Sequence, residues 1–204
     1  MTDFSKMNHV RLDALREIGN IGAGHAAASL SSITQQKVMI DVCRADLTNI
    51  KDMDRMLHQE SGDLLDIQSD FSGPIKGCIH YVMSKAGAVD FMDMLSVSPN
   101  GIAKESVGND LTVLKKCGSI LLSAYLKAIG DLAQFSLVCA SADAGYVKGM
   151  NFGSEILSKQ NTSNEMVFGI ETAFIASGKR IKVYFLLRTD QRGLELMFQQ
   201  LGIV

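Results

Sequence analysis

The chain has 204 residues, of which 47% are hydrophobic and 21% charged, and its net charge is −2. This composition excludes a disordered protein, and a nearly neutral chain offers no broad basic surface for nucleic acid. No apolar run reaches the roughly 18 residues that a membrane-spanning helix requires, and the polar N-terminus is unlike a signal peptide. We therefore expect a cytoplasmic globular protein that binds neither nucleic acid nor membrane.

The cysteines and histidines show no spacing typical of a metal site. The four cysteines stand at positions 43, 78, 117 and 139, without a CxxC pair, which argues against a zinc ribbon or a thioredoxin-like motif. Reduced, buried thiols are the expected state. The four histidines also lack ligand spacing, so we predict no intrinsic metal or cofactor.

The first half of the chain begins with a long predicted helix. Its interior glycines, Gly19, Gly22 and Gly24, each cost about 1 kcal/mol relative to alanine, so we expect something to pack very close to this helix. Hydrophobic periodicity and turn residues predict the elements of this half as follows: a helix over 6–33, a strand over 38–43, a connection or short helix over 49–60, a hairpin of strands 63–71 and 75–83, and a helix over 85–95.

After a break over 96–101, the same order of elements returns. We predict a helix over 104–129, a strand over 135–140, a hairpin of strands 165–176 and 180–187, and a helix over 190–201. Matching residues support a duplication, because four positions of the first helix recur 99 residues later: Leu12, Leu15, Gly19 and Ile21 as Leu111, Leu114, Gly118 and Ile120.

The repeat predicts one domain over 1–204, made of two half-repeats at about 6–98 and 104–204. Neither hairpin could bury its apolar face alone, but a shared sheet covered by helices could. We therefore predict an α+β fold with pseudo-twofold symmetry. Its sheet would be largely antiparallel with about six strands, and the two long helices would pair on one side.

One polar stripe of the first helix is the candidate functional site. At about 100° per residue, a single direction collects Asp13, Glu17, Asn20, Gly24 and Ser31. The carboxamide of Asn20 both donates and accepts hydrogen bonds and does not titrate, so it suits holding a water molecule in line with a phosphoryl group. Such spacing is also common on solvent-facing helices. The glycines do not form a nucleotide-binding loop, because their spacing is not GxGxxG.

The segment 12–30 resembles the first active-site helix of the CheC family, whose members CheC, CheX and FliY are phosphatases of the phosphorylated response regulator CheY. The resemblance implies that Asn20 enters the receiver's acidic pocket and orients the attacking water. It implies that Glu17 contacts a receiver lysine and that Asp13 and Gly24 belong to the partner-binding face. The receiver would bring the Mg²⁺.

The chain departs from the family pattern in both halves. In the second copy of the motif, the positions of Asp13, Glu17 and Asn20 hold Thr112, Lys116 and Ser119, which predicts a degenerate second site that is inactive as a phosphatase. In the first copy, Cys43 stands where the family has a proline. The duplication supplies the twofold pairing that single-motif relatives obtain by dimerising, so a monomer is expected.

Three functions remain open at this point. The first is a one-site phosphatase of a CheY-like receiver. The second is a non-catalytic binding module for the deamidase CheD or for a receiver domain, which could lose catalytic groups without penalty. The third is a structural role at the flagellar switch, by likeness to FliY and the middle domain of FliM.

Overall fold

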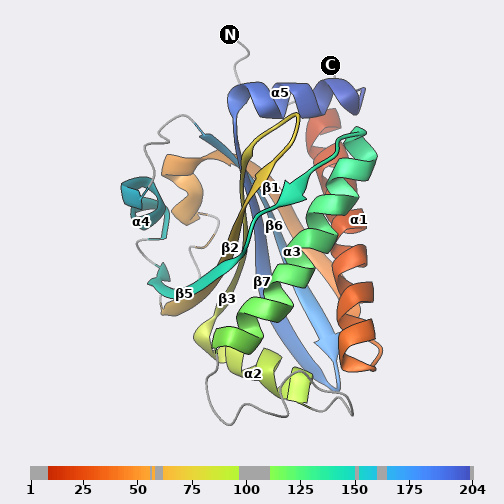
Figure 1. The fold of residues 1–204 in the computed structure, drawn as a ribbon, viewed down its shortest axis with the longest axis vertical. Helices are drawn as coiled ribbons and strands as arrows, with labels where there is room; N and C mark the ends of the chain where they lie inside the picture. The colour runs from red at the N-terminus through yellow and green to blue at the C-terminus, as the bar shows by residue number, and fades with distance from the viewer. Residues whose placement is uncertain are drawn as a thin grey trace.

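The computed structural model describes residues 9–55, 57, 62–96, 111–149, 152–159 and 165–202 (Figure 1). Its helices are α1 (His9–Thr34), the 3₁₀ helix η2 (Ile50–Arg55), α2 (Lys85–Ser96), α3 (Leu111–Ala133), α4 (Phe152–Lys159) and α5 (Gln191–Gln200). Its strands are β1 (Met39–Asn49), β2 (Asp63–Ser72), β3 (Gly77–Ser84), β4 (Val138–Cys139), β5 (Asp143–Lys148), β6 (Glu165–Ala176) and β7 (Lys179–Asp190). The predicted break over 97–101 and the helical residues predicted over 6–8 and 104–110 lie outside the described residues.

The helices cover the sheet from both sides and at its ends. Figure 1 shows α1 and α3 side by side on one face, whereas α4 and η2 lie against the other. In the same view α5 crosses one end of the sheet and α2 the opposite end. The expected pairing of the two long helices on one side is therefore confirmed.

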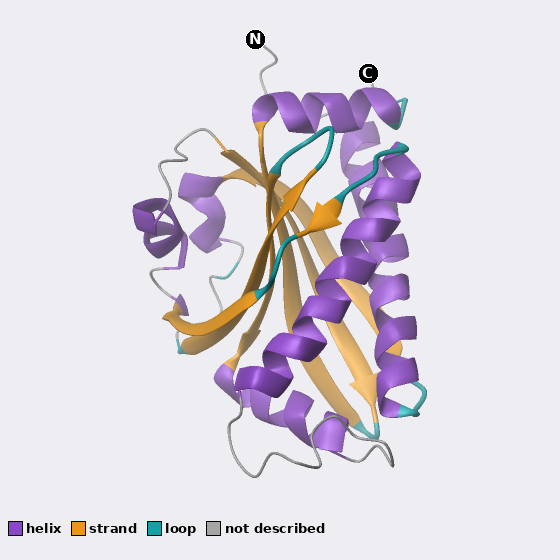
Figure 2. Ribbon diagram, viewed as in Figure 1, coloured by secondary structure: helices purple, strands orange, loops and turns teal. Residues whose placement is uncertain are grey.

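The described strands form one seven-stranded sheet in the order β1-β6-β7-β3-β2-β4, with β5 also paired to β2. All of its pairings are antiparallel, and Figure 2 shows the strands as one curved layer between the helices. The predicted α+β class is confirmed. The sheet of about six strands that was predicted is joined in the described residues by one strand that was not expected, β5.

The strand order is nearly symmetric about the centre of the sheet, because corresponding strands of the two halves of the chain occupy equivalent places on either side of it. The hairpins β2–β3 and β6–β7 meet in the centre through the β3–β7 pairing. Outside them, β1 pairs with β6 and β5 pairs with β2, so each hairpin is flanked by a strand from the other half of the chain. Two half-repeats that exchange their first strands would give this order. The division into half-repeats itself stays a prediction.

Most element boundaries agree with the sequence pattern, and the disagreements have identifiable causes. The predicted strand over 135–140 is reduced to the two residues of β4. The strand β5 escaped prediction because it is short and contains Gly145, a residue that strands disfavour. The strand β1 extends to Asn49, although its second part, Arg44–Asn49, has the polar composition of an edge strand.

The core is divided by the sheet into two clusters. The larger cluster lies under α1 and α3, where the rings of Tyr125 and Phe185 stack with centroids 4.4 Å apart. The smaller one lies under α4 and η2 and is built around Phe152, Met53 and Leu186. The long helices are thus anchored by their apolar faces, which fixes the direction in which their polar faces point.

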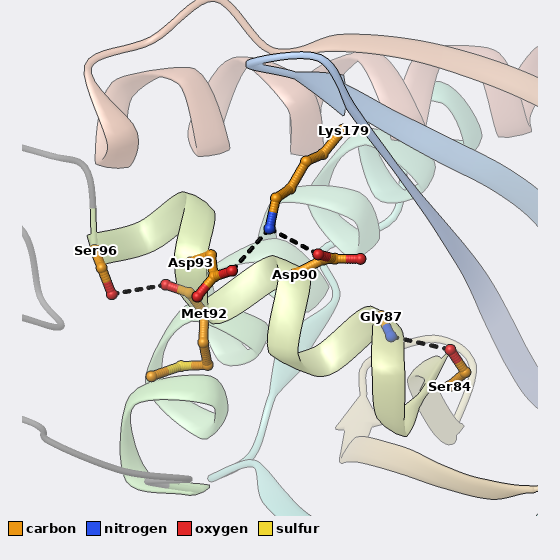
Figure 3. A network of polar contacts seen from close by, with 7 residues as sticks. All are labelled: Ser84, Gly87, Asp90, Met92, Asp93, Ser96 and Lys179. Atoms are coloured by element: carbon orange, nitrogen blue, oxygen red, sulfur yellow. Dashed lines mark hydrogen bonds and ion pairs between the residues drawn. The ribbon is translucent and has the colours of Figure 1, made fainter.

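A polar network ties α2 to the turn between β6 and β7 (Figure 3). The ammonium group of Lys179 lies 2.7 Å from a carboxylate oxygen of Asp90 and 2.7 Å from one of Asp93. At the start of α2, the Ser84 hydroxyl accepts a hydrogen bond from the Gly87 backbone N–H at 3.0 Å, as an N-cap does. These contacts hold the end of the sheet and are far in sequence from the predicted site.

Candidate functional site

The predicted α1 face is open to solvent. Asp13, Glu17, Asn20 and Gly24 are all exposed, whereas Leu15 and Ile18, which alternate with them along the helix, are buried against the sheet. Burial of Glu17 and Asn20 would have excluded them from contact with a partner protein. The structure instead brings the four side-chain positions together on one surface.

The two central groups of this face are not engaged within the molecule. The side chains of Glu17 and Asn20 make no hydrogen bond or ion pair with any other residue that the structure describes. The neighbouring ion pair between Arg16 and Asp13 spans 3.7 Å, with side chains 61% and 72% exposed. Such a solvated pair contributes little to stability, so Asp13 can exchange it for a partner's cation at small cost.

Ser31 does not belong to this surface, and its inclusion in the polar stripe was wrong. Its side chain is half-buried, and its hydroxyl donates to the Ala27 carbonyl oxygen at 2.8 Å and accepts from the Val38 backbone N–H at 3.0 Å. The hydroxyl therefore links the end of α1 to the start of β1. The helical angle alone could not reveal this, because the chain turns back toward the helix just after Thr34.

The glycines of α1 serve different purposes. A Cβ on Gly19 would lie 2.7 Å from Ile170 Cδ1 of β6, and one on Gly22 would lie 2.8 Å from Tyr125 Cε2 of α3. The predicted close packing is therefore confirmed at these two positions. A Cβ on Gly24 would meet nothing within 4 Å. Because glycine costs an exposed helix about 1 kcal/mol relative to alanine, Gly24 is disfavoured locally and gains nothing from internal packing.

Cys43, which replaces the family's proline, lies at an irregularity of the edge strand β1. The register passes from the pair Val42–Thr172 to the pair Arg44–Glu171, so Cys43 has no partner in the ladder. Bulges and edge strands are where a sheet tolerates proline, since no ladder hydrogen bond is lost there. The bulge in this chain forms without the proline ring.

The second copy of the motif lies on α3. Thr112 and Lys116 are exposed and Ser119 is half-buried. Figure 1 shows α3 running antiparallel to α1, since their colours progress in opposite directions along the view. Because both motifs stand in the first half of their helices, the two faces lie toward opposite ends of the helix pair. The α1 face presents a carboxylate and a carboxamide, whereas the α3 face presents an ammonium group and a hydroxyl.

A buried polar network on the opposite face of the sheet was not predicted. His80 Nδ1 lies 3.0 and 3.2 Å from the two carboxylate oxygens of Asp66, and Arg188 Nε donates to His80 Nε2 at 3.0 Å. All three residues are at most 5% exposed. Because the Arg188 guanidinium can only donate, this contact requires Nε2 to accept and places the ring proton on Nδ1, facing Asp66. The only signal in the sequence was a charged residue inside each of two apolar strands.

Neither a metal cluster nor a membrane-spanning helix is found in the described part of the chain. No three His, Cys, Asp or Glu side chains among those residues are grouped as metal ligands. Within the same ranges, no helix combines the length and hydrophobicity needed to cross a bilayer.

Comparisons with known proteins agree with the fold, and one of them matches the segment that contains α1. The model of the CheC-like family matches residues 10–42, which include α1 and the beginning of β1. These residues carry the exposed Glu17 and Asn20, and over this segment the chain is similar to the CheC-like family. Over 207 residues it is 24% identical to the CheY-P phosphatase CheC of Bacillus subtilis (strain 168), with 99% of each chain covered.

Solved structures of other proteins share the fold, and two of them serve as examples. FliY of Thermotoga maritima superposes with a TM-score of 0.76 at 15% identity, covering 96% of this chain and 98% of that one. The FliM middle domain of H. pylori superposes with a TM-score of 0.63 at 14% identity, covering 95% and 99%. At these identities the similarity establishes the architecture and leaves the chemistry to the residues of the site.

Proposed function

We propose that this protein acts in chemotaxis signalling as a phosphatase of a phosphorylated CheY-like receiver domain, with Glu17 and Asn20 as its catalytic residues. One observation carries the proposal: this pair is exposed and unengaged on α1, inside the segment that matches the CheC-like family. The similarity over the full length to a CheY-P phosphatase supports the same reaction.

The proposed reaction is the hydrolysis of the receiver's aspartyl phosphate, catalysed by residues of α1. A water oxygen attacks the phosphorus, the bond from phosphorus to the aspartate oxygen breaks, and the products are a free carboxylate and inorganic phosphate, which takes the water proton. Such a reaction depends mainly on positioning and charge stabilisation. The Asn20 carboxamide can hold the water in line without changing its own charge.

Glu17 stands one helical turn before Asn20 on the same face, where its carboxylate can pair with a cation of the receiver. This contact would fix the receiver so that Asn20 points at the phosphoryl group. The Mg²⁺ that balances the phosphoryl charge would come with the receiver. The α3 face would be inactive, because Lys116 would repel a receiver cation and Ser119 has a shorter side chain than asparagine.

The decisive experiment measures phosphate release from a phosphorylated receiver in the presence of Mg²⁺. Asn20→Ala should lower kcat by 10²-fold or more, as expected for loss of a group that acts in the transition state, while Ser119→Ala, the matched change on α3, should leave the rate unchanged. Glu17→Ala should also lower the rate, with a larger share of the effect in KM. Equal rates for Asn20→Ala and the wild-type protein would refute the proposal.

A second candidate function is a non-catalytic binding module for CheD or for a receiver domain. The replacement of both catalytic positions on α3 favours it, since this half of the chain has kept its fold without the catalytic groups. The likeness to the FliM middle domain is compatible with this function at the level of architecture. Tight binding of CheD or a receiver without faster phosphate release would support the module and exclude the phosphatase.

A further inference from the structure

Among the three glycines in the central part of α1, Gly24 is the one whose missing side chain is not required by internal packing. Gly19 and Gly22 are forced to be glycine by Ile170 and Tyr125, whereas a side chain at position 24 would enter open solvent. Its backbone has no positive φ that would require glycine. A residue that favours helix would therefore fit here without strain.

The direction of helical side chains connects Gly24 to Asn20. Cα–Cβ bonds in an α-helix tilt toward the N-terminus, so a side chain covers the turn that precedes its own residue. A side chain at position 24 would lean over position 20, four residues earlier on the same exposed face. Asparagine is short, and its carboxamide extends only a little above the helix surface. Gly24 thus leaves the Asn20 carboxamide uncovered from its C-terminal side.

We propose that Gly24 is a specificity-determining residue that allows the receiver backbone to approach α1 closely enough for Asn20 to reach the phosphoryl group. This inference rests on the proposed phosphatase function and adds a steric requirement to it. The α3 face provides a contrast, because the position that corresponds to Gly24, 99 residues later, holds the exposed Ser123. The second face is therefore partly covered as well as lacking the catalytic pair.

The proposal predicts effects of opposite sign on stability and on catalysis. Gly24→Ala and Gly24→Gln should raise Tm by about 2–4 °C, because each removes a glycine from an exposed helix. The same changes should raise KM for the phosphorylated receiver, by about tenfold or more for Gly24→Gln, with a smaller increase for Gly24→Ala. A residue with a purely structural role would not lose substrate affinity while gaining stability.

The experiment combines thermal unfolding with steady-state phosphate release from a phosphorylated receiver. Ser123→Gln, the equivalent change on α3, serves as the control and should leave KM and kcat unchanged. A wild-type KM for Gly24→Gln would overturn the inference, provided that the wild-type protein accelerates phosphate release. If the wild-type protein shows no acceleration, and Asn20→Ala behaves identically, the proposed function itself fails.

Discussion

Gly118 of α3 packs directly on Ile67 of β2, so that a Cβ on this glycine would lie 2.5 Å from Ile67 Cδ1 and 2.8 Å from Cγ2. Gly19 of α1 stands in the same relation to Ile170 of β6, where the nearest approach would be 2.7 Å. In both cases a helix from one half of the chain contacts a hairpin strand from the other half. The two long helices are therefore held against the sheet by matching contacts, each between a helix of one half of the chain and a strand of the other.

Substitution of Gly118 tests the close packing of α3 against β2. Gly118→Ala should lower the free energy of unfolding by about 1–2 kcal/mol, since overpacking outweighs the gain in helix propensity. Gly19→Ala should cost less, because its methyl group meets mainly the flexible end of Ile170. Urea unfolding measures both values. The double variant Gly118→Ala/Ile67→Val should recover part of the loss, and an increase in stability for Gly118→Ala alone would contradict the close packing.

The buried network of Asp66, His80 and Arg188 makes a second prediction about stability. Asp66→Ala should destabilise the fold by about 2–3 kcal/mol, because it removes the acceptor of His80 Nδ1–H and leaves this buried donor unsatisfied. The control is Asp46→Ala, which breaks an exposed ion pair with Arg44 and should change stability by less than about 1 kcal/mol. Comparable effects from these two variants would show that the network contributes no more than a surface ion pair.

Much of the fold was predictable because local signals agree with the final packing. The β6–β7 hairpin is an example: Ser177 and Gly178 both have positive φ, at 51° and 77°, as a tight hairpin turn requires, and the flanking strands are long and apolar. The strand β5 was missed because its pattern is weak and its stability comes from pairing with β2, which is distant in sequence. Tertiary pairing of this kind leaves little trace in a local window.

The predicted site shows the same limit. Helical spacing placed Asp13, Glu17 and Asn20 on one exposed face, but it also included Ser31, whose hydroxyl is used between α1 and β1. Spacing could not separate Gly24 from Gly19 and Gly22, because the difference depends on what lies across from each glycine. Contacts between distant segments decide such questions, and a single sequence does not contain them.

Cysteine reactivity provides a third prediction. Burial raises the pKa of the Cys117 thiol to about 11, while nearby Lys116 lowers it only in part. At pH 8 this thiol stays protonated and covered, so iodoacetamide should not modify Cys117 in the folded protein. In urea the pKa returns toward the ordinary value near 8.5 and the thiol should react readily. Peptide mapping after alkylation measures the difference, and rapid modification of Cys117 under native conditions would indicate that α3 does not stay seated on the sheet.

The strongest test of the relation between the two faces is to restore the second one. In an Asn20→Ala background, where the proposed α1 site is inactive, Lys116→Glu together with Ser119→Asn recreates the catalytic pair on α3. If the two helices present equivalent surfaces, phosphate release from a phosphorylated receiver should rise above that of Asn20→Ala alone. Adding Ser123→Gly should raise it further, since this change uncovers the new asparagine in the way that Gly24 uncovers Asn20.

The control for this restoration is Ser119→Asn without the change at Lys116, which should remain inactive because the ammonium group still repels a receiver cation. Thermal unfolding must show that each variant is folded, and all of these positions are at least partly exposed on α3, so large losses are not expected. A folded quadruple variant, which also carries Ser123→Gly, with no gain in rate would mean that Thr112 or the surroundings of α3 also exclude the receiver. The proposed loss of function on α3 would then extend beyond Lys116, Ser119 and Ser123 to the docking surface as a whole.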